Sequence, residues 1–249
     1  MPGERRLRIL RQLVPSEGQA VGTRRLCEVS ATVTGLDGAG ITVMAGEVNQ
    51  GSLGASDEVS RTIEELQFAL GEGPCRDAHR DQRPVLEPDL RAPAQARWPA
   101  FSPLVVEAGG RAVFAFPLRL GAVRLGALDL YRDRPGRLTD DQHADALVLA
   151  DVVTEAVLLM QSAAPAGLLA AALAEGADLH PVVHQATGMV AAQLGASVGE
   201  ALVRLKAFAF GNGRALDEVA KDVLAGTLRF DRTGDGRDDG PSDEQDQGQ

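Results

Sequence analysis

Near the C-terminus, one aromatic side chain stands among cationic side chains at helical spacing. Phe210 follows Lys206 by one helical turn, and Arg204 and Arg214 lie close to it in the sequence. Proteins that bind unpaired RNA bases stack the bases on aromatic rings and hold neighbouring phosphates with lysine or arginine. These residues are therefore candidates for RNA binding. The alternative is that Phe210 packs against a helix expected over residues 168–174 or against a partner chain, since an exposed phenylalanine without a partner is uncommon.

Cysteine and histidine offer a second kind of chemistry, but their spacing favours neither an enzyme nor a metal site. Cys75 could sense redox state, although a buried reduced cysteine is commoner and Cys27 is far away in the sequence. His180 and His184 stand four residues apart without a carboxylate or cysteine nearby. No Ser-His-Asp or paired-carboxylate arrangement is visible. We therefore expect no enzyme and no metal, and the sequence requires no cofactor.

Three short amphipathic helices between residues 179 and 230 must position the candidate RNA-binding residues. Each apolar run has helical spacing and ends in glycine or in a Gly-Asn-Gly turn. Ser197 and Glu200 form a capping box at the start of the second helix, and the third helix begins near Leu216. A bundle this small usually serves as a recognition unit. The residues expected in its core are Val182, Val183, Ala186, Met189, Val190, Leu194, Ala201, Leu202, Leu205, Phe208, Ala209, Leu216, Val219, Ala220, Val223 and Leu224.

The first of these helices has an unusually flat outer face. Gly188, Ala191 and Ala192 form it beside His184 and Gln185. A glycine inside a helix costs about 1 kcal/mol relative to alanine, so Gly188 should have a packing or functional reason. Small side chains would let RNA approach closely, which adds Gln185 and Gly188 to the candidates. The alternative is a solvated face of good helix formers.

Residues 20–161 are expected to form a separate α+β domain, in which helices flank an antiparallel sheet, after an N-terminal segment at residues 1–19. Strands are expected over residues 41–45, 46–54 and 83–86 and in a hairpin over residues 111–131. Helices are expected over residues 20–33 and 57–66, with a helical turn after the loop at residues 71–75.

A long apolar helix is expected after a capping box formed by Thr139 and Gln142, and it should end near residue 162. It is too apolar to stand alone, so it should pack on its own sheet, on a partner chain, or on both. We therefore expect a homodimer joined through this helix, with Val153 and Leu158 at the contact. Residues 162–178 should form a linker with a short helix.

The net charge of −10 is distributed unevenly along the 249 residues. Residues 179–230 hold five Lys and Arg against four Asp and Glu, a net charge of +1. Residues 231–249 hold seven acidic residues against two arginines, a net charge of −5, and are expected to form a disordered tail. So few cations predict weak phosphate binding by one copy, so recognition would need a dimer or contacts with bases.

Composition favours a soluble cytoplasmic protein. The chain is 44% hydrophobic, yet no apolar run approaches the length of a membrane span. The N-terminal residues are charged and show no signal-peptide core, and two distant cysteines favour reduced thiols. We expect no contact with a membrane.

The C-terminal helices carry a recognisable residue pattern. Its parts are Gln185-Ala186-x-Gly188-Met189, Ala201-x-x-x-Leu205-Lys206, and Asn212 with Leu216-x-x-Val219-Ala220. This pattern resembles the ANTAR domain of bacterial transcription antiterminators, which bind paired hairpins in nascent RNA and prevent the terminator hairpin from forming. The resemblance implies an RNA-binding surface that includes Asn212. Thr187 stands where the family often has a lysine, so the candidate contact there lacks a charge.

The first domain carries a second pattern. Its parts are Leu26-Cys27, Gly38 to Val43, Gln67-Phe68-x-Leu70-Gly71-Glu72-Gly73-Pro74-Cys75, Pro117-Leu118-Arg119 and Gly126 to Tyr131. It resembles the GAF domain, a sensory module often found ahead of ANTAR domains in actinobacterial regulators. Such domains bind varied small molecules, including cyclic nucleotides, haem and bilins, or act only as dimerisation platforms. The resemblance implies a possible small-molecule ligand without identifying it.

Together these patterns predict a signal-responsive transcription regulator: a GAF sensor, residues 20–161, followed by a three-helix ANTAR bundle, residues 179–230, that binds RNA hairpins. One alternative is a protein-interaction or scaffold module. Another is a helix-turn-helix-like DNA-binding protein. Asp217, Glu218 and Asp222 argue against DNA, because they would face phosphates if the third helix entered a major groove.

Overall fold

The computed structural model describes residues 2–13, 22–45, 48–92, 97–163, 180–231 and 236–238. The chain divides into two compact units, Met1–Leu179 and His180–Gln249. We describe each unit by itself. The linker helix expected over residues 168–174 lies outside the described residues.

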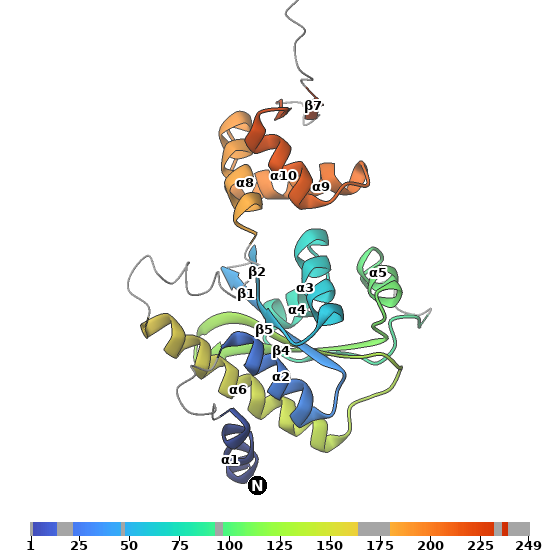
Figure 1. Ribbon diagram of the computed structural model, residues 1–249, viewed down its shortest axis with the longest axis vertical. Helices are drawn as coiled ribbons and strands as arrows, with labels where there is room; N and C mark the ends of the chain where they lie inside the picture. The colour runs from blue at the N-terminus through green and yellow to red at the C-terminus, as the bar shows by residue number, and fades with distance from the viewer. Residues whose placement is uncertain are drawn as a thin grey trace, which may run out of the picture. The chain divides into compact units, whose positions relative to one another are not determined.

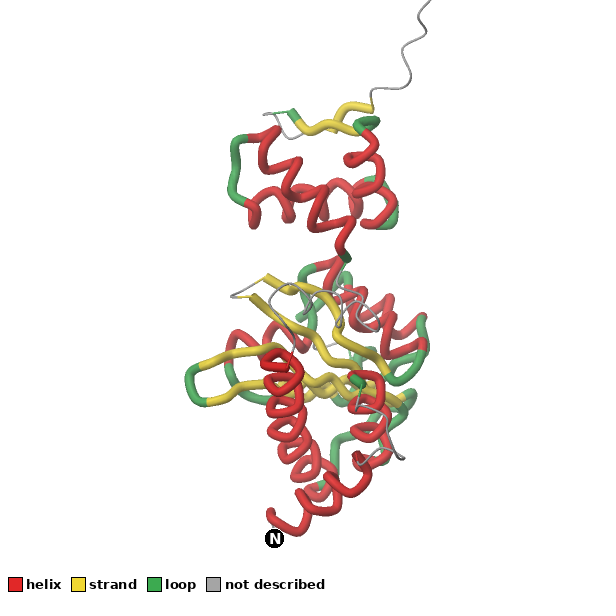
Figure 2. The backbone as a smooth tube through the Cα atoms, turned by 60° about the vertical axis from the view of Figure 1, so that its left-hand side comes forward, coloured by secondary structure: helices red, strands yellow, loops and turns green. Residues whose placement is uncertain are grey.

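The first unit is built on a five-stranded sheet in which all described neighbours are antiparallel (Figures 1 and 2). The strand order is β2-β1-β5-β4-β3. The expected α+β fold with an antiparallel sheet is confirmed, and so is the expected hairpin, which turns at Gly121 between β4 and β5. The strands are β1 (Gly38–Ala45), β2 (Val48–Ala55), β3 (Val85–Glu87), β4 (Ala112–Leu120) and β5 (Val123–Arg132).

Helices cover both faces of this sheet (Figure 1). Side chains alternate along β4, so that Phe114 and Phe116 join one core while Val113 and Ala115 join the other. The helices of the first core are α1 (Pro2–Leu13), α2 (Thr23–Thr34) and α6 (Asp140–Ala163). The helices of the second core are α3 (Glu58–Leu70), α4 (Pro74–Asp81) and α5 (Phe101–Glu107).

The sequence reasoning did not anticipate the helices α1 and α5. Only two apolar side chains of α1, Ile9 and Leu13, are buried in the core, and four arginines obscure their helical spacing. Helix α5 has only seven residues, too few to show a period. Tertiary packing therefore defines both helices more than their own sequence does.

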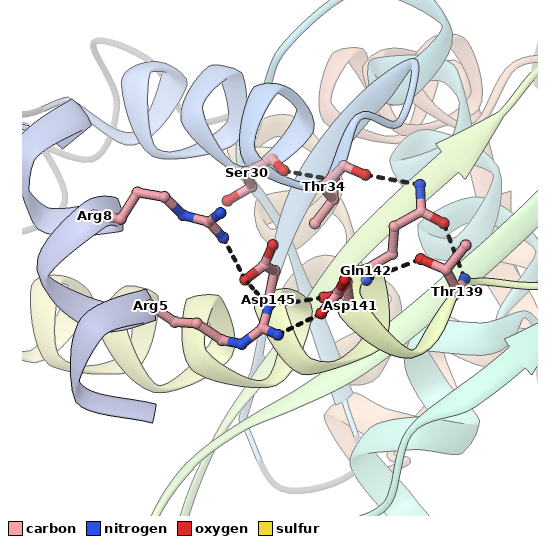
Figure 3. A network of polar contacts seen from close by, with 8 residues as sticks. All are labelled: Arg5, Arg8, Ser30, Thr34, Thr139, Asp141, Gln142 and Asp145. Atoms are coloured by element: carbon pink, nitrogen blue, oxygen red, sulfur yellow. Dashed lines mark hydrogen bonds and ion pairs between the residues drawn. The ribbon is translucent and has the colours of Figure 1, made fainter. Parts of the chain in front are cut away.

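Charged side chains attach α1 to the beginning of α6 (Figure 3). Asp145, which is buried, accepts hydrogen bonds from Arg5 Nη1 at 2.7 Å and from Arg8 Nη2 at 2.6 Å. Arg5 also pairs with Asp141. Because one carboxylate oxygen serves two guanidinium groups, Asp145 is the centre of the attachment.

The capping box expected at the start of α6 is confirmed. The Thr139 amide donates to Gln142 Oε1 at 3.0 Å, and the Gln142 amide donates to Thr139 Oγ1 at 3.2 Å. Gln142 Nε2 also donates to the Thr34 carbonyl at 2.9 Å, which ties the start of α6 to the end of α2 (Figure 3).

The inner face of α6 is covered within its own domain. Val153 is only 1% exposed and belongs to the core, and Leu158 packs against that core. The expectation that Val153 lies at a contact between copies is therefore wrong, because α1, α2 and the sheet already cover the apolar face. The apolar side chains that α6 leaves exposed are Leu147, at 43%, and Leu159, at 68%.

The second unit contains three helices and a small hairpin in its described residues (Figure 2). The capping box of its second helix is confirmed, because the Ser197 hydroxyl accepts from the Glu200 amide and the Glu200 carboxylate accepts from the Ser197 amide. The elements are α8 (Pro181–Leu194), α9 (Val198–Gly211), α10 (Leu216–Ala225), β6 (Leu228–Phe230) and β7 (Gly236–Asp238). Eleven of the expected core residues are buried, namely Val183, Ala186, Val190, Ala201, Leu202, Leu205, Ala209, Leu216, Val219, Ala220 and Val223.

The hairpin adds a buried aromatic side chain to the core of this unit. Phe230 of β6 is buried with its ring 5.4 Å from the ring of Phe208, and its amide donates to Gln193 Oε1. Met189, expected inside, is 38% exposed. Strand β7 pairs with β6 in a segment expected to be disordered. The remainder of that segment, residues 232–235 and 239–249, lies outside the described residues.

Asp145→Asn should loosen α1, because an amide cannot pair with two guanidinium groups as a carboxylate does. We expect amide hydrogen exchange of α1 to rise by about tenfold, as loss of a charge-assisted hydrogen bond implies. Mass spectrometry of the exchanged full chain measures this. Glu28→Gln is the control, since it removes an exposed ion pair with Arg24. Unchanged exchange in α1 would show that Ile9 and Leu13 hold the helix alone.

Candidate functional site

The solvent face of α9 carries an exposed stripe formed by Val203, Ala207 and Phe210. Their spacing of four and three residues places them in one line along the helix. Val203 and Phe210 are each 66% exposed. Arg204 is exposed next to the stripe, and Lys206 lies one turn before Phe210. The apolar stripe thus has cations at its edge, which is the arrangement expected from the sequence.

Two candidates lie on the outer face of α8. Gln185 and Gly188 are both exposed. A Cβ atom added at Gly188 would meet nothing within 4 Å, so close packing does not explain this glycine. The flat face of α8 is therefore open at this position within the described structure.

Three other candidates have structural contacts of their own. Thr187 is only 1% exposed, and its hydroxyl donates to the Val183 carbonyl at 2.7 Å, so its burial excludes a surface contact. Asn212 ends α9, and its Nδ2 donates to the Phe208 carbonyl at 2.8 Å. Arg214 Nη2 pairs with Asp222 at 2.6 Å. The candidates that are exposed are Gln185, Gly188, Arg204, Phe210 and Asn212, the last with its amide already hydrogen-bonded within α9.

The start of α9 has a local charge arrangement that affects Arg204. The Ser197 amide and hydroxyl hydrogen-bond to the Glu200 carboxylate and, with Arg204, lower the pKa of Glu200 below its usual range. Glu200 therefore stays ionised one turn before Arg204. An RNA phosphate would compete with this carboxylate for the arginine.

The first unit contains a second arrangement that could carry function, a buried polar ring. Gln67 of α3 donates to Asp129 Oδ2 at 2.9 Å and accepts from the Cys75 amide at 2.8 Å. Thr42 of β1 donates to the Glu64 carboxylate. Asp129 of β5 lies next to Glu64 and raises its pKa. The ring thus joins β1, β5, α3 and α4 in the interior.

One proton must be shared between the two carboxyl groups of this ring. Burial, and then the charge of Asp129, raise the pKa of Glu64 well above its usual value, and burial raises the pKa of Asp129 to about 6. Glu64 Oε1 and Asp129 Oδ1 have no hydrogen-bond partner in the described residues. We therefore assign a protonated Glu64 that donates to Asp129, because two adjacent buried negative charges would be unstable.

Neighbouring glycines make room for the ring. A Cβ atom at Gly40 would lie 2.4 Å from Glu64 Oε1. A Cβ atom at Gly126 would lie 1.9 Å from the Thr42 carbonyl oxygen. Any larger residue at either position would displace part of the ring.

Sequence reasoning missed the buried ring, although a signal for it existed. Glu64 and Gln67 lie three residues apart on the inward face of α3, and Asp129 interrupts the apolar run Leu125 to Tyr131. Polar residues at positions that periodicity assigns to the core are the mark of such a cluster. Burial also raises the pKa of the Cys75 thiol, which disfavours the thiolate that redox chemistry needs.

Comparison with known families identifies the first unit. Residues 23–158 match the family model described as GAF domain, which is more than half of the chain. The chain belongs to the GAF domain family. The match ends before α8, so the second unit lies outside it. A search of curated proteins returned no match.

Solved structures similar to the chain include other GAF domains. The GAF domain of a phosphoenolpyruvate-protein phosphotransferase from Coxiella burnetii is 14% identical, with 64% of this chain and 96% of that chain covered and a TM-score of 0.47. The corresponding domain from Acinetobacter is 10% identical, with 65% and 96% covered and a TM-score of 0.48. The chromophore-binding domain of a Stigmatella aurantiaca bacteriophytochrome is 10% identical, with 63% and 60% covered and a TM-score of 0.42.

The described residues contain no group of three or more His, Cys, Asp or Glu side chains that could hold a metal ion. Within the same part of the chain, every helix is too short or too polar to span a membrane.

Glu64→Gln should flatten the pH dependence of stability of the GAF domain. The pair binds its proton more tightly when folded, so the free energy of unfolding of the wild type falls as pH rises from about 4.5 through about 6 and above. A glutamine keeps the hydrogen bonds but has no proton to lose. We therefore expect the variant to gain stability relative to the wild type between pH 5 and pH 8.

Chemical denaturation at these two pH values, followed by the fluorescence of the single tryptophan, Trp98, measures the difference. Glu65→Gln is the control, because Glu65 lies on the same helix but pairs with Arg61 at the surface. Parallel pH profiles for the wild type and Glu64→Gln would show that no proton is shared.

Proposed function

We propose that the chain is a signal-responsive transcription regulator whose GAF domain senses a signal and whose helical unit, residues 180–230, binds hairpins in nascent mRNA as an antiterminator. The observation that carries this proposal is the exposed stripe of α9, where Phe210 stands in solvent beside cationic side chains. Such a role would place the protein in the cytoplasm, where bacterial transcripts emerge.

The residues of the ANTAR-like pattern divide into buried and exposed positions, and this division supports the proposal. Its apolar positions other than Met189 are buried in the helical unit, whereas Gln185 and Gly188 are exposed. A sequence pattern that only maintained a fold would not need a polar residue and an open glycine on the surface. The buried positions are Ala186, Ala201, Leu205, Leu216, Val219 and Ala220.

The stripe also suits RNA on energetic grounds. Exposed Phe210 offers a ring on which an unpaired base can stack, worth about 1–3 kcal/mol per base. The helical unit has a net charge of only +1, so phosphate contacts alone would give modest affinity. Recognition would then depend on base stacking and on the presence of two copies.

An alternative is that the helical unit binds another protein. The exposure of Val203, two turns before Phe210 on α9, favours this alternative. A helix presents two large apolar side chains one turn or two apart when it enters a hydrophobic groove. DNA binding fits less well, because Glu218 is exposed on α10 and Asp217 and Asp222 are only partly buried.

Phe210→Ala should weaken RNA binding by about tenfold, because it removes a stacking surface. Arg204→Ala should weaken it less and reduce the salt dependence by a slope of about one, as loss of one phosphate contact implies. The probe is RNA crosslinked to the full chain in its host, sequenced and resynthesised. We expect paired hairpins to be enriched, and fluorescence anisotropy at several salt concentrations gives the affinities.

Lys221→Ala is the matched control for charge, since Lys221 is exposed on α10 and not on the helix that carries the stripe. It should leave the affinity and the salt slope nearly unchanged. Equal effects of Lys221→Ala and Arg204→Ala would indicate general attraction to phosphate rather than this surface. If no RNA is enriched and Phe210→Ala abolishes capture of a protein, the interaction-module alternative holds.

We also propose that the protein is a homodimer joined through the outer surface of α1 and α6. These helices expose two leucines of α1, Leu7 and Leu10, and two of α6, Leu147 and Leu159, of which Leu159 is the most exposed. Exposed leucines on two helices that pack together are typical of helices covered by another helix pair.

Leu159→Glu should shift the protein from dimer to monomer, because a charge would be placed in the apolar contact. Sedimentation equilibrium over a range of concentrations measures this. Leu120→Glu is the control, since Leu120 is 55% exposed at the far end of the β4–β5 hairpin. A wild type that remains monomeric at every concentration would contradict the dimer.

A further inference from the structure

A hollow of about 340 Å³ lies on the side of α4 that faces away from the sheet. Helix α4 buries Cys75, Ala78 and His79, whereas its Arg76, Asp77 and Arg80 line this hollow. Its walls are the loop Gly71–Gly73, the side chains of Arg76, Asp77 and Arg80 of α4, and the pair Arg97–Trp98 that precedes α5. This volume is at the lower end of the range for small-molecule sites.

The walls of the hollow are fixed by hydrogen bonds. Asp77 accepts from Trp98 Nε1 at 3.1 Å and pairs with Arg97 Nε at 2.8 Å and with Arg80 Nη2 at 3.0 Å. Glu72 Oε1 accepts from the amides of Ala100 and Phe101, each at 2.8 Å. The two carboxylates that line the hollow are therefore committed to holding its walls together.

The loop at the entrance is equally constrained. Gly73 has a φ of +136°, and a Cβ atom there would lie 2.6 Å from Gln67 Oε1. Only glycine suits this position, because L side chains rarely adopt this backbone conformation. The loop is thus held in one shape before any ligand arrives, which lowers the entropic cost of binding.

The cations of the hollow exceed its anions. Three arginines face two carboxylates along its lining. Arg76 donates to the Gly71 carbonyl, and in the described part of the chain no carboxylate pairs with it. Arg97 uses Nε for Asp77 and lies with its guanidinium carbon 5.0 Å from the centre of the Trp98 ring, which orients the plane of the group.

We propose that this hollow binds a small anion through a carboxylate or phosphate group held by Arg76 and Arg97. Guanidinium groups match both oxyanions, because two parallel N–H donors can meet two oxygen atoms. The proposal deepens the sensory role of the GAF domain by naming the chemistry of an input. It does not depend on RNA binding by the helical unit.

Two probes, inorganic phosphate and succinate, distinguish the sources of such a group. Isothermal titration calorimetry and thermal unfolding of the full chain are compared with sodium chloride at matched ionic strength. We expect at least one probe to bind and to raise the Tm. Binding of phosphate alone identifies a phosphate ligand, binding of succinate alone a carboxylate ligand, and binding of both the chemistry that they share.

Arg76→Gln should reduce the affinity for the bound probe by about tenfold, since it removes one charge-assisted contact while leaving the ion pairs of Asp77 in place. Its Tm without probe should stay near that of the wild type, which separates loss of binding from loss of folding. Arg124→Gln is the matched control, because Arg124 is exposed on the β4–β5 hairpin.

Two results would overturn the proposal. One is the absence of heat and of a Tm shift with both probes at millimolar concentration. The other is an equal loss of affinity in Arg76→Gln and Arg124→Gln, which would reveal general attraction to positive charge. Neither result bears on the RNA proposal, because the hairpin-binding assay uses no phosphate or succinate and tests residues of α9.

Discussion

The burial of two neighbouring carboxyl groups, Glu64 and Asp129, is the constraint on which the interior of the GAF domain depends most. Both carboxyl groups are buried, and no cation is placed to neutralise them in the described residues. Without the proton, α3 would face β5 across two like charges, and the interior would have to open to admit water. With the proton, Thr42 and Gln67 complete the ring and fix α3 against the sheet.

Helix α4 connects this ring to the arginine-lined hollow. On its inner side the Cys75 amide donates to Gln67, and on its outer side Arg76 and Asp77 face the hollow. Gly73 contributes to both the ring and the hollow. Its lack of a side chain leaves room for Gln67, and its loop forms a wall of the hollow. An anion held by Arg76 would thus bind to a helix whose other face is hydrogen-bonded to Gln67, the partner of Asp129.

Sequence patterns predicted the elements that are long enough to show a periodic spacing. They did not predict structure that depends on contacts between residues far apart in the chain. The hairpin of β4 and β5, the capping boxes at Thr139 and Ser197 and most of the helical core follow from local spacing. Helix α1 could not be predicted in the same way, because its position depends on Asp145, which lies over a hundred residues away. Among the candidate RNA-binding residues, Thr187 is buried and was not expected to be. Helical periodicity places it at the boundary of the apolar arc, where spacing alone does not decide whether a side chain is buried.

The helical unit shows how a small core limits the surface that can carry function. Its core is filled by small and aliphatic side chains, with Phe208 and Phe230 closing one end. Asn212 ends α9, and Arg214 holds the turn before α10 through its pair with Asp222. The exposed candidates are Phe210, Arg204 and Asn212 at α9 and Gln185 with the open Gly188 on α8. A surface with so little charge gains specificity from shape and stacking rather than from phosphate attraction, so pairing two such units is the physical route to tight binding.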